Sequence, residues 1–275
     1  MAKEEKNETA KKVKAKDVQR GVWNPETLSE IRYKAETGKH RIRGCGATIR
    51  FPNFDDLLIL PSQLSRLSID TYREDCKTQT VLGARFAKKP LVIETPIMIS
   101  GMSYGALSKE AKTALAKSTQ IVGTSINNGE GGLLPEESEN SFKQVVQITP
   151  SRMGFSLRNI EAADAIEIIC GIGAKPGLSG HLMGSKITKE IAAFRQLPEG
   201  IDLHSHPRHG DIFGADDMVL KIQELRDVTD WQIPIFVKIA AGGVKEDVKI
   251  AAKTGADGIV VDGCEGGTGA APVMG

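Results

Sequence analysis

The 275-residue sequence predicts an α/β protein built on a parallel sheet. From Leu91 onward, short apolar runs of strand length alternate with segments of helical periodicity, which indicates right-handed βαβ units. Glycine, asparagine, glutamate and lysine gather where the apolar runs end, whereas the predicted helices carry no such residues in a pattern. This asymmetry is typical of a TIM (β/α)8 barrel, in which the loops after the strands carry the chemistry.

The alternation predicts six strands, at 91–99, 120–126, 145–149, 165–170, 233–239 and 257–262. The first helix is expected to begin after Ser108, which is suited to cap it. Further helices are expected near 159–165 and at 188–195, 216–226 and 245–254. A closed barrel needs eight strands, and the sixth predicted strand runs into the glycine-rich loop EGGTGAAPVMG at the end of the sequence. We therefore expect a barrel truncated after about six strands: a fragment, half of a split enzyme, or a chain that a partner completes. An open doubly wound sheet is the alternative, but no strand leads into a complete Gly-x-Gly-x-x-Gly fingerprint.

Composition and charge divide the chain and exclude several classes of protein. Residues 1–22 are rich in lysine and glutamate and predict a mobile charged tail, 23–90 predicts an extension that packs against or plugs the barrel, and 91–275 predicts the incomplete barrel itself. The 36 Lys and Arg nearly balance the 35 Asp and Glu, so we expect no nucleic-acid partner. No membrane span or leader is predicted, and the four scattered cysteines support neither disulfides nor an iron-sulfur cluster, so we expect a cytoplasmic protein.

The stretch AIEIICGIGAKPGLSGHLMG, at 165–184, is the strongest candidate for an active-site loop. A buried strand empties here into a segment with five glycines, one proline and a single lysine, Lys175. An ordinary connection is the alternative for this loop taken alone. Lys238 ends another buried strand, and a buried ammonium is costly unless an anion faces it, so either a ligand anion or an ion pair is expected there.

Seven segments in order, from about Gly44 to the C-terminus, resemble the FMN-binding synthase domain of glutamate synthases. The likeness is greatest to the standalone kind, which includes large subunits of archaeal-type glutamate synthase and of N-methylglutamate synthase. The segments are FDDLLILPSQL, PIMISGMSYGALS, NNGEGG, Gln147 with SRMGF, GAKPGxxGHLMG, VKI with Lys238, and DGCEGGTGAAP.

The resemblance implies an enzyme in which reduced FMN converts the imine of 2-oxoglutarate and ammonia, or methylamine, to glutamate or N-methylglutamate. It implies an amidotransferase or electron-donor subunit as partner. Cofactor contacts are implied for Met102, Ser103, Gly105, Gln147, Lys238, Gly266 and Gly267. Substrate contacts are implied for Arg152, Lys175, Ser179 and His181, and catalytic roles for Glu130, Lys175 and Lys238.

The sequence departs from the family pattern beside the expected flavin. Glutamate synthases usually carry Gln-Ile-Lys on the fourth strand and a glutamine before GAKPG, where this chain has Glu167, Ile168, Ile169 and Ile172. The alternative function is therefore a non-catalytic or fragmentary barrel subunit that needs a partner to complete the flavin site.

Several side chains have competing interpretations. Arg152 suits either the substrate or a surface ion pair. His204, His206 and His209 have a spacing that allows zinc, yet no acidic set stands at ligand spacing, and we predict no metal. Cys264 is interpreted as a small packed residue rather than a nucleophile.

Overall fold

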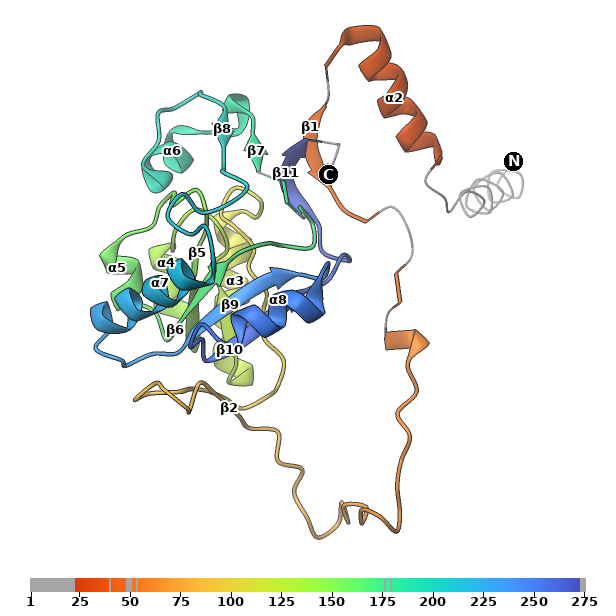
Figure 1. Cartoon of the computed structure of the whole chain (residues 1–275), viewed down its shortest axis with the longest axis vertical. Coiled ribbons are helices and arrows are strands. Elements are labelled where there is room, and N and C mark those ends of the chain that lie inside the picture. Colours follow the sequence, from red (N-terminus) through yellow and green to blue (C-terminus); the bar gives the residue numbers. More distant parts are fainter. Residues whose placement is uncertain are drawn as a thin grey trace, which may run out of the picture.

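The computed structural model describes residues 23–39, 41–47, 51–52, 54–175, 177–178 and 180–272, so the predicted tail at 1–22 lies outside the described residues. At its centre is a five-stranded parallel sheet in the order β10–β9–β6–β5–β4 (Figure 1). Ile99 bridges in parallel to Ile126 of β4, which adds one more strand position at that edge. The strands are β4 (Ser125–Asn127), β5 (Lys143–Ile148), β6 (Ala165–Ile169), β9 (Ile235–Ala240) and β10 (Gly258–Asp262).

The strand order separates the two predicted architectures. Each parallel strand pairs with the next parallel strand along the chain, as in the registers Val145↔Ala165 and Ile166↔Ile235. A doubly wound sheet reverses its order at a switch point, whereas a (β/α)8 barrel adds every strand on the same side. The described sheet shows no reversal. The predicted barrel-type α/β fold is confirmed, and it occupies six successive strand positions.

Helices cover the outer face of the sheet (Figure 1). α7 (Ala215–Val228) packs Met218, Ile222 and Leu225, which recur on one side of the helix, against the strand side chains Ile166 and Val237. The other helices behind the sheet are α3 (Lys109–Val122), α4 (Pro135–Asn140), α5 (Leu157–Glu161) and α8 (Val244–Ala251).

The predicted strand at 120–126 is wrong in its first half. α3 begins at Ser108, whose side chain accepts a hydrogen bond from the Ala111 amide, and it continues to Val122. It ends at Gly123, which has the left-handed φ of 68° that glycine adopts without strain. Ile121 lies in this helix and is 86% exposed, so its β-branched side chain is not part of a buried strand.

The predicted strand at 91–99 divides into two parts. β3 (Leu91–Ile93) pairs antiparallel with β2 (Thr80–Leu82), and only Ile99 reaches the parallel sheet. Pro96 lies between these parts and has no amide hydrogen to donate to a strand ladder. Leu91 and Ile93 pack against buried residues near the amino ends of the strands, so the β2–β3 pair lies at the end of the sheet opposite the loops that follow the strands.

An excursion of the chain follows β6. It contains β7 (His181–Leu182), the short 3-10 helix η2 (Gly184–Lys186), α6 (Lys189–Arg195) and β8 (Leu203–His204). Leu182, Ile187, Ile191 and Leu203 form a separate apolar cluster with Tyr104. This cluster holds the excursion beside the carboxyl ends of the strands.

The amino-terminal region lies largely apart from the sheet (Figure 1). α2 (Pro25–Thr37) is capped by Asn24, β1 (Ile42–Cys45) pairs antiparallel with β11 (Thr268–Pro272), and η1 spans Phe54–Asp56. From there to β2 the chain is extended, and its large apolar side chains are exposed. In the described part of the chain, no helix is long and apolar enough to cross a membrane.

Candidate functional site

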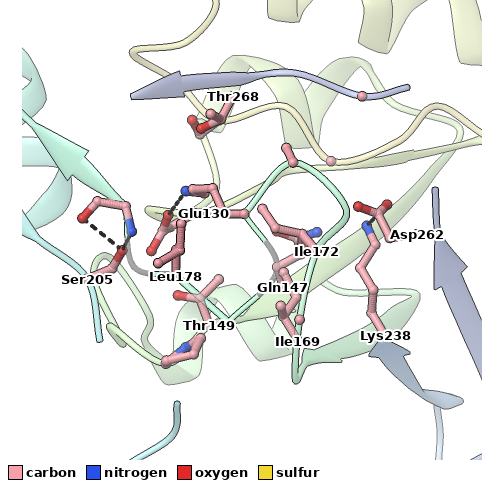
Figure 2. Close-up of a pocket in the computed structure, with 18 of the residues that line it drawn as sticks. Glu130, Gln147, Thr149, Ile169, Ile172, Leu178, Ser205, Lys238, Asp262 and Thr268 are labelled. Carbon is pink, nitrogen blue, oxygen red and sulfur yellow. Dashed lines mark hydrogen bonds and ion pairs between the residues drawn. The ribbon is translucent and has the colours of Figure 1, made fainter. Parts of the chain in front are cut away.

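A cavity of about 400 Å³ opens at the carboxyl ends of the parallel strands (Figure 2). Its size falls in the range of pockets that bind small molecules and cofactors. Loops that follow Ile99, β4, β5, β6 and β10 contribute to its wall. The predicted site residues that line it are Met102, Ser103, Glu130, Gln147, Lys175, Lys238, Gly266 and Gly267.

A smaller pocket of about 50 Å³ adjoins the cavity, and we call it the annex. Gly105 and His181 line the annex, while Glu130, Lys175 and Ser103 line both spaces. Ser179, predicted to bind substrate, lies outside the described residues. The tertiary structure thus gathers most of the predicted residues, which come from widely separated loops, around two connected spaces.

Two carboxylates face Lys238 at one side of the cavity. Its Nζ lies 3.4 Å from Glu167 Oε1 and 3.4 Å from Asp262 Oδ1, and Figure 2 shows Lys238 pointing at Asp262. Glu167 also accepts hydrogen bonds from Asn127 Nδ2 at 2.9 Å and from Gln147 Nε2 at 2.7 Å. The sequence left either a ligand anion or an ion pair as the partner of this buried ammonium, and the structure shows ion pairs within the protein.

Lys175 and Glu130 meet where the cavity joins the annex. Lys175 Nζ lies 3.9 Å from Glu130 Oε2, while Glu130 Oε1 accepts a 2.8 Å hydrogen bond from Ser151 Oγ. Glu130 is therefore oriented at one oxygen and faces a cation at the other. This arrangement leaves Lys175 without a close carboxylate partner among the described residues.

Arg195 lines the annex as well, and the sequence did not single it out. It is 5% exposed, and its Nη2 donates to the Tyr104 carbonyl at 2.7 Å, but its Nε has no hydrogen-bond partner among the described residues. Burial lowers the pKa of Arg195, and the nearby Glu130 carboxylate opposes that shift. An arginine in the last turn of a predicted helix looks like an ordinary surface residue in the sequence, so only the fold reveals this position.

Glycines make room for these two cations. A Cβ at Gly180 would lie 2.9 Å from Lys175 Nζ, and a Cβ at Gly131 would lie 2.8 Å from Arg195 Nε. Gly131 also has a φ of 104°, which side chains rarely adopt. The glycine-rich character of both loops therefore has a local cause, since the cationic side chains occupy the space that larger residues would need.

A buried lysine, Lys112, joins the loop that follows Ile99 to the loop that follows β4. Lys112 Nζ donates to the carbonyls of Met102 at 2.6 Å and Asn128 at 3.0 Å, and it lies 3.0 Å from Glu137 Oε2. The Lys112 and Glu137 side chains are 1% and 0% exposed. Burial lowers the pKa of Lys112 and raises the pKa of Glu137, and the attraction within the pair opposes both shifts.

Arg152 lines neither space. Its backbone has a left-handed φ of 56°, and its Nη2 donates to Asp211 Oδ1 at 2.8 Å and Oδ2 at 3.1 Å. Lys221 Nζ lies 2.9 Å from the same carboxylate. Burial raises the pKa of Asp211, but Lys221 and Arg152 together outweigh burial and hold it at about 2. The position agrees with the surface ion pair, the second interpretation of this arginine.

The three loop histidines do not converge. His209 is buried, and its Nε2 donates a 2.6 Å hydrogen bond to the Ile169 carbonyl; burial lowers the pKa of His209. His206 lines the cavity, and His204 stacks on His181 instead.

Ile169 and Ile172 both line the cavity. Figure 2 places Ile172 between Glu130 on one side and Lys238 with Asp262 on the other. These side chains give the middle of the cavity an apolar wall between two charged ends.

Comparison with known proteins gives a consistent family. The conserved region in glutamate synthase matches residues 50–274. A glutamate synthase large subunit-like protein of Rhizobium meliloti (strain 1021) is 49% identical over 244 residues, covering 89% of this chain and 55% of that protein. An archaeal glutamate synthase (NADPH) of Methanocaldococcus jannaschii is 35% identical over 282 residues, covering 91% of this chain and 54% of the relative. The chain thus spans about half the length of these curated relatives.

Solved structures match more distantly. A mandelate oxidase variant with an FMN adduct has a TM-score of 0.42 and 16% identity, covering 84% of this chain and 58% of that chain. This score is too low to support an inference about fold or cofactor.

Proposed function

Because the chain belongs to the glutamate synthase family, we propose that it carries the substrate side of a flavin-dependent glutamate synthase. The reaction is reduction of the imine of 2-oxoglutarate and ammonia, or methylamine, to glutamate or N-methylglutamate. The observation that carries this proposal is the annex, where Lys175 and Arg195 face a space next to one oriented carboxylate, Glu130.

Lys175 and Arg195 are proposed to bind the carboxylates of the dicarboxylic substrate. A buried guanidinium with an unused Nε donor favours an anionic partner, because an unmet buried donor costs about 1–3 kcal/mol, and more when it is charged. The Arg195 fork suits a planar carboxylate, and the Lys175 ammonium adds a compact charge on the cavity side. Arg152 has no part in this scheme, since its guanidinium binds Asp211.

Glu130 is proposed to move the proton. Reduction breaks the C=N π bond, forms a C–H bond by hydride addition, and forms an N–H bond with a proton. Ser151 fixes one oxygen of Glu130, so the other oxygen is aimed at the space beside Lys175, where the imine nitrogen would lie. The Lys175 ammonium lies 3.9 Å from that second oxygen and so borders the same space.

The larger cavity fits a flavin ring. Its apolar middle, lined by Ile169 and Ile172, suits the hydrocarbon part of the ring, and a Cβ at Gly266 would meet no atom within 4 Å, so that wall is open. Met102, Ser103, Gly266 and Gly267 would hold the ring along the backbone, and FMN would supply hydride when bound. Lys238 would act there as part of a charge-balanced group with Glu167 and Asp262. An electron-donor or amidotransferase subunit is the proposed partner.

A second candidate function is a non-catalytic barrel subunit that needs a partner to complete the flavin site. The observation that favours it is the same wall, because Ile169 and Ile172 offer no hydrogen bonds to a cofactor and Lys238 is already paired.

One set of measurements separates the two functions. The full-length chain is titrated with FMN, reduced chemically, and supplied with 2-oxoglutarate and ¹⁵N-ammonium, and labelled glutamate is quantified. We expect flavin binding and glutamate formation, with Lys175→Met binding flavin but losing glutamate formation. Lys253→Met is the matched control, since Lys253 is exposed beyond the end of α8. A chain that binds no FMN, alone or with its co-purifying partners, supports the non-catalytic alternative.

A further inference from the structure

The β7–β8 ribbon presents three metal-ligating side chains on one face. His181 pairs directly with His204 in the antiparallel register, and Leu182 pairs with Leu203. Side chains alternate between the faces of a strand, so Asp202, two residues before His204, emerges on the same face. Its position is diagonal to His181, within the reach of cross-strand neighbours.

The three side chains are in contact. His181 Nε2 lies 2.9 Å from Asp202 Oδ2, and the His181 and His204 rings are 3.7 Å apart at their centroids with a tilt of 38°. One ligand atom from each residue lies within 4.8 Å of the others. Among the residues that the structure describes, this is a group of two imidazoles and one carboxylate with no lysine or arginine ion pair to its carboxylate.

The Asp202 carboxylate is oriented by a backbone amide. Asp202 Oδ1 accepts a 2.7 Å hydrogen bond from the Gly184 amide, which leaves Oδ2 directed at the histidines. His181 is buried, whereas Asp202 and His204 are exposed, so an ion can reach the group from solvent.

We propose that His181, Asp202 and His204 form a binding site for a divalent transition-metal ion of the zinc class. Two imidazole nitrogens and a carboxylate oxygen are ligands that zinc prefers, whereas Mg²⁺ and Ca²⁺ prefer oxygen alone. Tetrahedral bonds of about 2.0–2.1 Å place ligand atoms roughly 3.3 Å apart, so the exposed His204 ring has to turn out of its stack on His181 for both imidazoles to bind one ion. Water fills the fourth position.

The site would stiffen the loop that carries Lys175. Ser205, next to His204, accepts a 2.7 Å hydrogen bond from the Gly180 amide at its Oγ and donates its own amide to the Gly180 carbonyl at 3.0 Å. A metal that bridges the two strands therefore fixes Gly180 as well, and with it the wall of the annex. This inference does not depend on the proposed function, because all the ligands belong to this chain.

Sequence spacing pointed to other partners for His204. The pattern His204, His206 and His209 suggests a cluster along one loop. In the structure, the strand pairing brings His181 and Asp202 to His204, in place of His206 and His209.

The experiment measures Zn²⁺ binding by calorimetry on the full-length chain after treatment with a chelator, with Co²⁺ as a spectroscopic probe. We expect one Zn²⁺ per chain, tetrahedral Co²⁺ absorption without sulfur charge-transfer bands, and a higher unfolding temperature in Zn²⁺. His204→Ala and Asp202→Asn should each weaken binding at least tenfold, whereas His206→Ala in the same loop should leave it unchanged.

Both test positions are exposed, and asparagine keeps the acceptor for the Gly184 amide, so the metal-free variants should unfold at the wild-type temperature. Wild-type protein that binds no Zn²⁺ overturns the proposal. So does binding that His204→Ala and Asp202→Asn leave unchanged, or a Co²⁺ spectrum dominated by thiolate bands, since either places the ion on other ligands.

Discussion

Lys238 and Lys175 line the same cavity, but only Lys238 is closely paired with carboxylates of the protein. Lys238 projects from β9 and lies 3.4 Å from each of two carboxylates. Lys175 belongs to the loop after β6, and 3.9 Å separates it from Glu130. The strand lysine is thus neutralised within the protein, whereas the loop lysine keeps charge available for a ligand.

The difference follows from where each residue is anchored. Residues on adjacent strands are held by the backbone ladder. Lys238 is paired with Ile169 and Val260, so Glu167 and Asp262 are its diagonal neighbours, within reach of its long side chain. Leaving such a buried cation unpaired would cost several kcal/mol. Lys175 is on a loop at the cavity mouth, where a substrate can supply the anion. The following substitutions test this contrast, from the largest expected effect to the smallest.

Lys112→Met should cause the largest loss of stability. Lys112 is paired with Glu137 and is more deeply buried than either cavity lysine, and breaking a buried pair typically costs about 3–5 kcal/mol because the remaining charge is uncompensated. The free energy of unfolding in urea measures this. Lys112→Met with Glu137→Leu should recover most of the loss. A single variant within about 1 kcal/mol of wild type would contradict the assignment of this pair.

Lys238→Met should cost about 3 kcal/mol, at the lower end of the range for buried pairs. Asn127 and Gln147 still donate to Glu167 in this variant, and Asp262 is 26% exposed, so the remaining charges are partly compensated. The same urea unfolding measures the loss, and the double variant with Glu167→Gln should regain more than half of it. If Lys238→Met is as stable as wild type but binds FMN far more weakly, Lys238 serves the ligand rather than the ion pair.

Lys175→Met should change stability by less than about 1 kcal/mol, because its nearest carboxylate is distant. Its affinity for 2-oxoglutarate should fall at least tenfold, which corresponds to about 1.4 kcal/mol. Calorimetric titration measures the affinity, with Lys253→Met as the control. A Lys175→Met variant that is strongly destabilised, yet binds 2-oxoglutarate normally, would show that Lys175 serves stability, as Lys238 is expected to do, and not ligand binding.

Asp211→Asn should have the smallest effect, visible only through its pH dependence. The pKa of Asp211 is about 2 in the folded chain and about 3.8 when unperturbed, so its ion pairs stabilise the fold above about pH 4. That contribution disappears as the pH falls toward 2. Solvent screening at this half-exposed carboxylate keeps it below about 1 kcal/mol. Urea midpoints should therefore differ most between variant and wild type at pH 5, differ less at pH 3 and converge toward pH 2; an equal difference at pH 5 and pH 2 would contradict the ion-pair role.

The sequence by itself determined the alternation of strands and helices along the chain and indicated the loops where function is proposed to lie. Apolar runs, Ser108 as a cap and glycines after strands are local signals, because propensity and backbone freedom act over a few residues. They also indicated Lys175 and Lys238, whereas Glu130 was implied by the family resemblance. Local signals misjudged 91–99 and 120–126, where a proline and a helix ending at Gly123 override the apolar pattern.

Only the tertiary structure decided which charges meet. Glu167 and Asp262 reach Lys238 through strand register, Arg195 reaches the annex through the packing of α6, and Asp202 reaches His181 across a ribbon. Each contact joins residues that are far apart in sequence or, for the ribbon, depends on the pairing of two short strands. Side-chain patterns report burial along one element, whereas ion pairs and ligand sets depend on the distances between elements, which packing alone fixes.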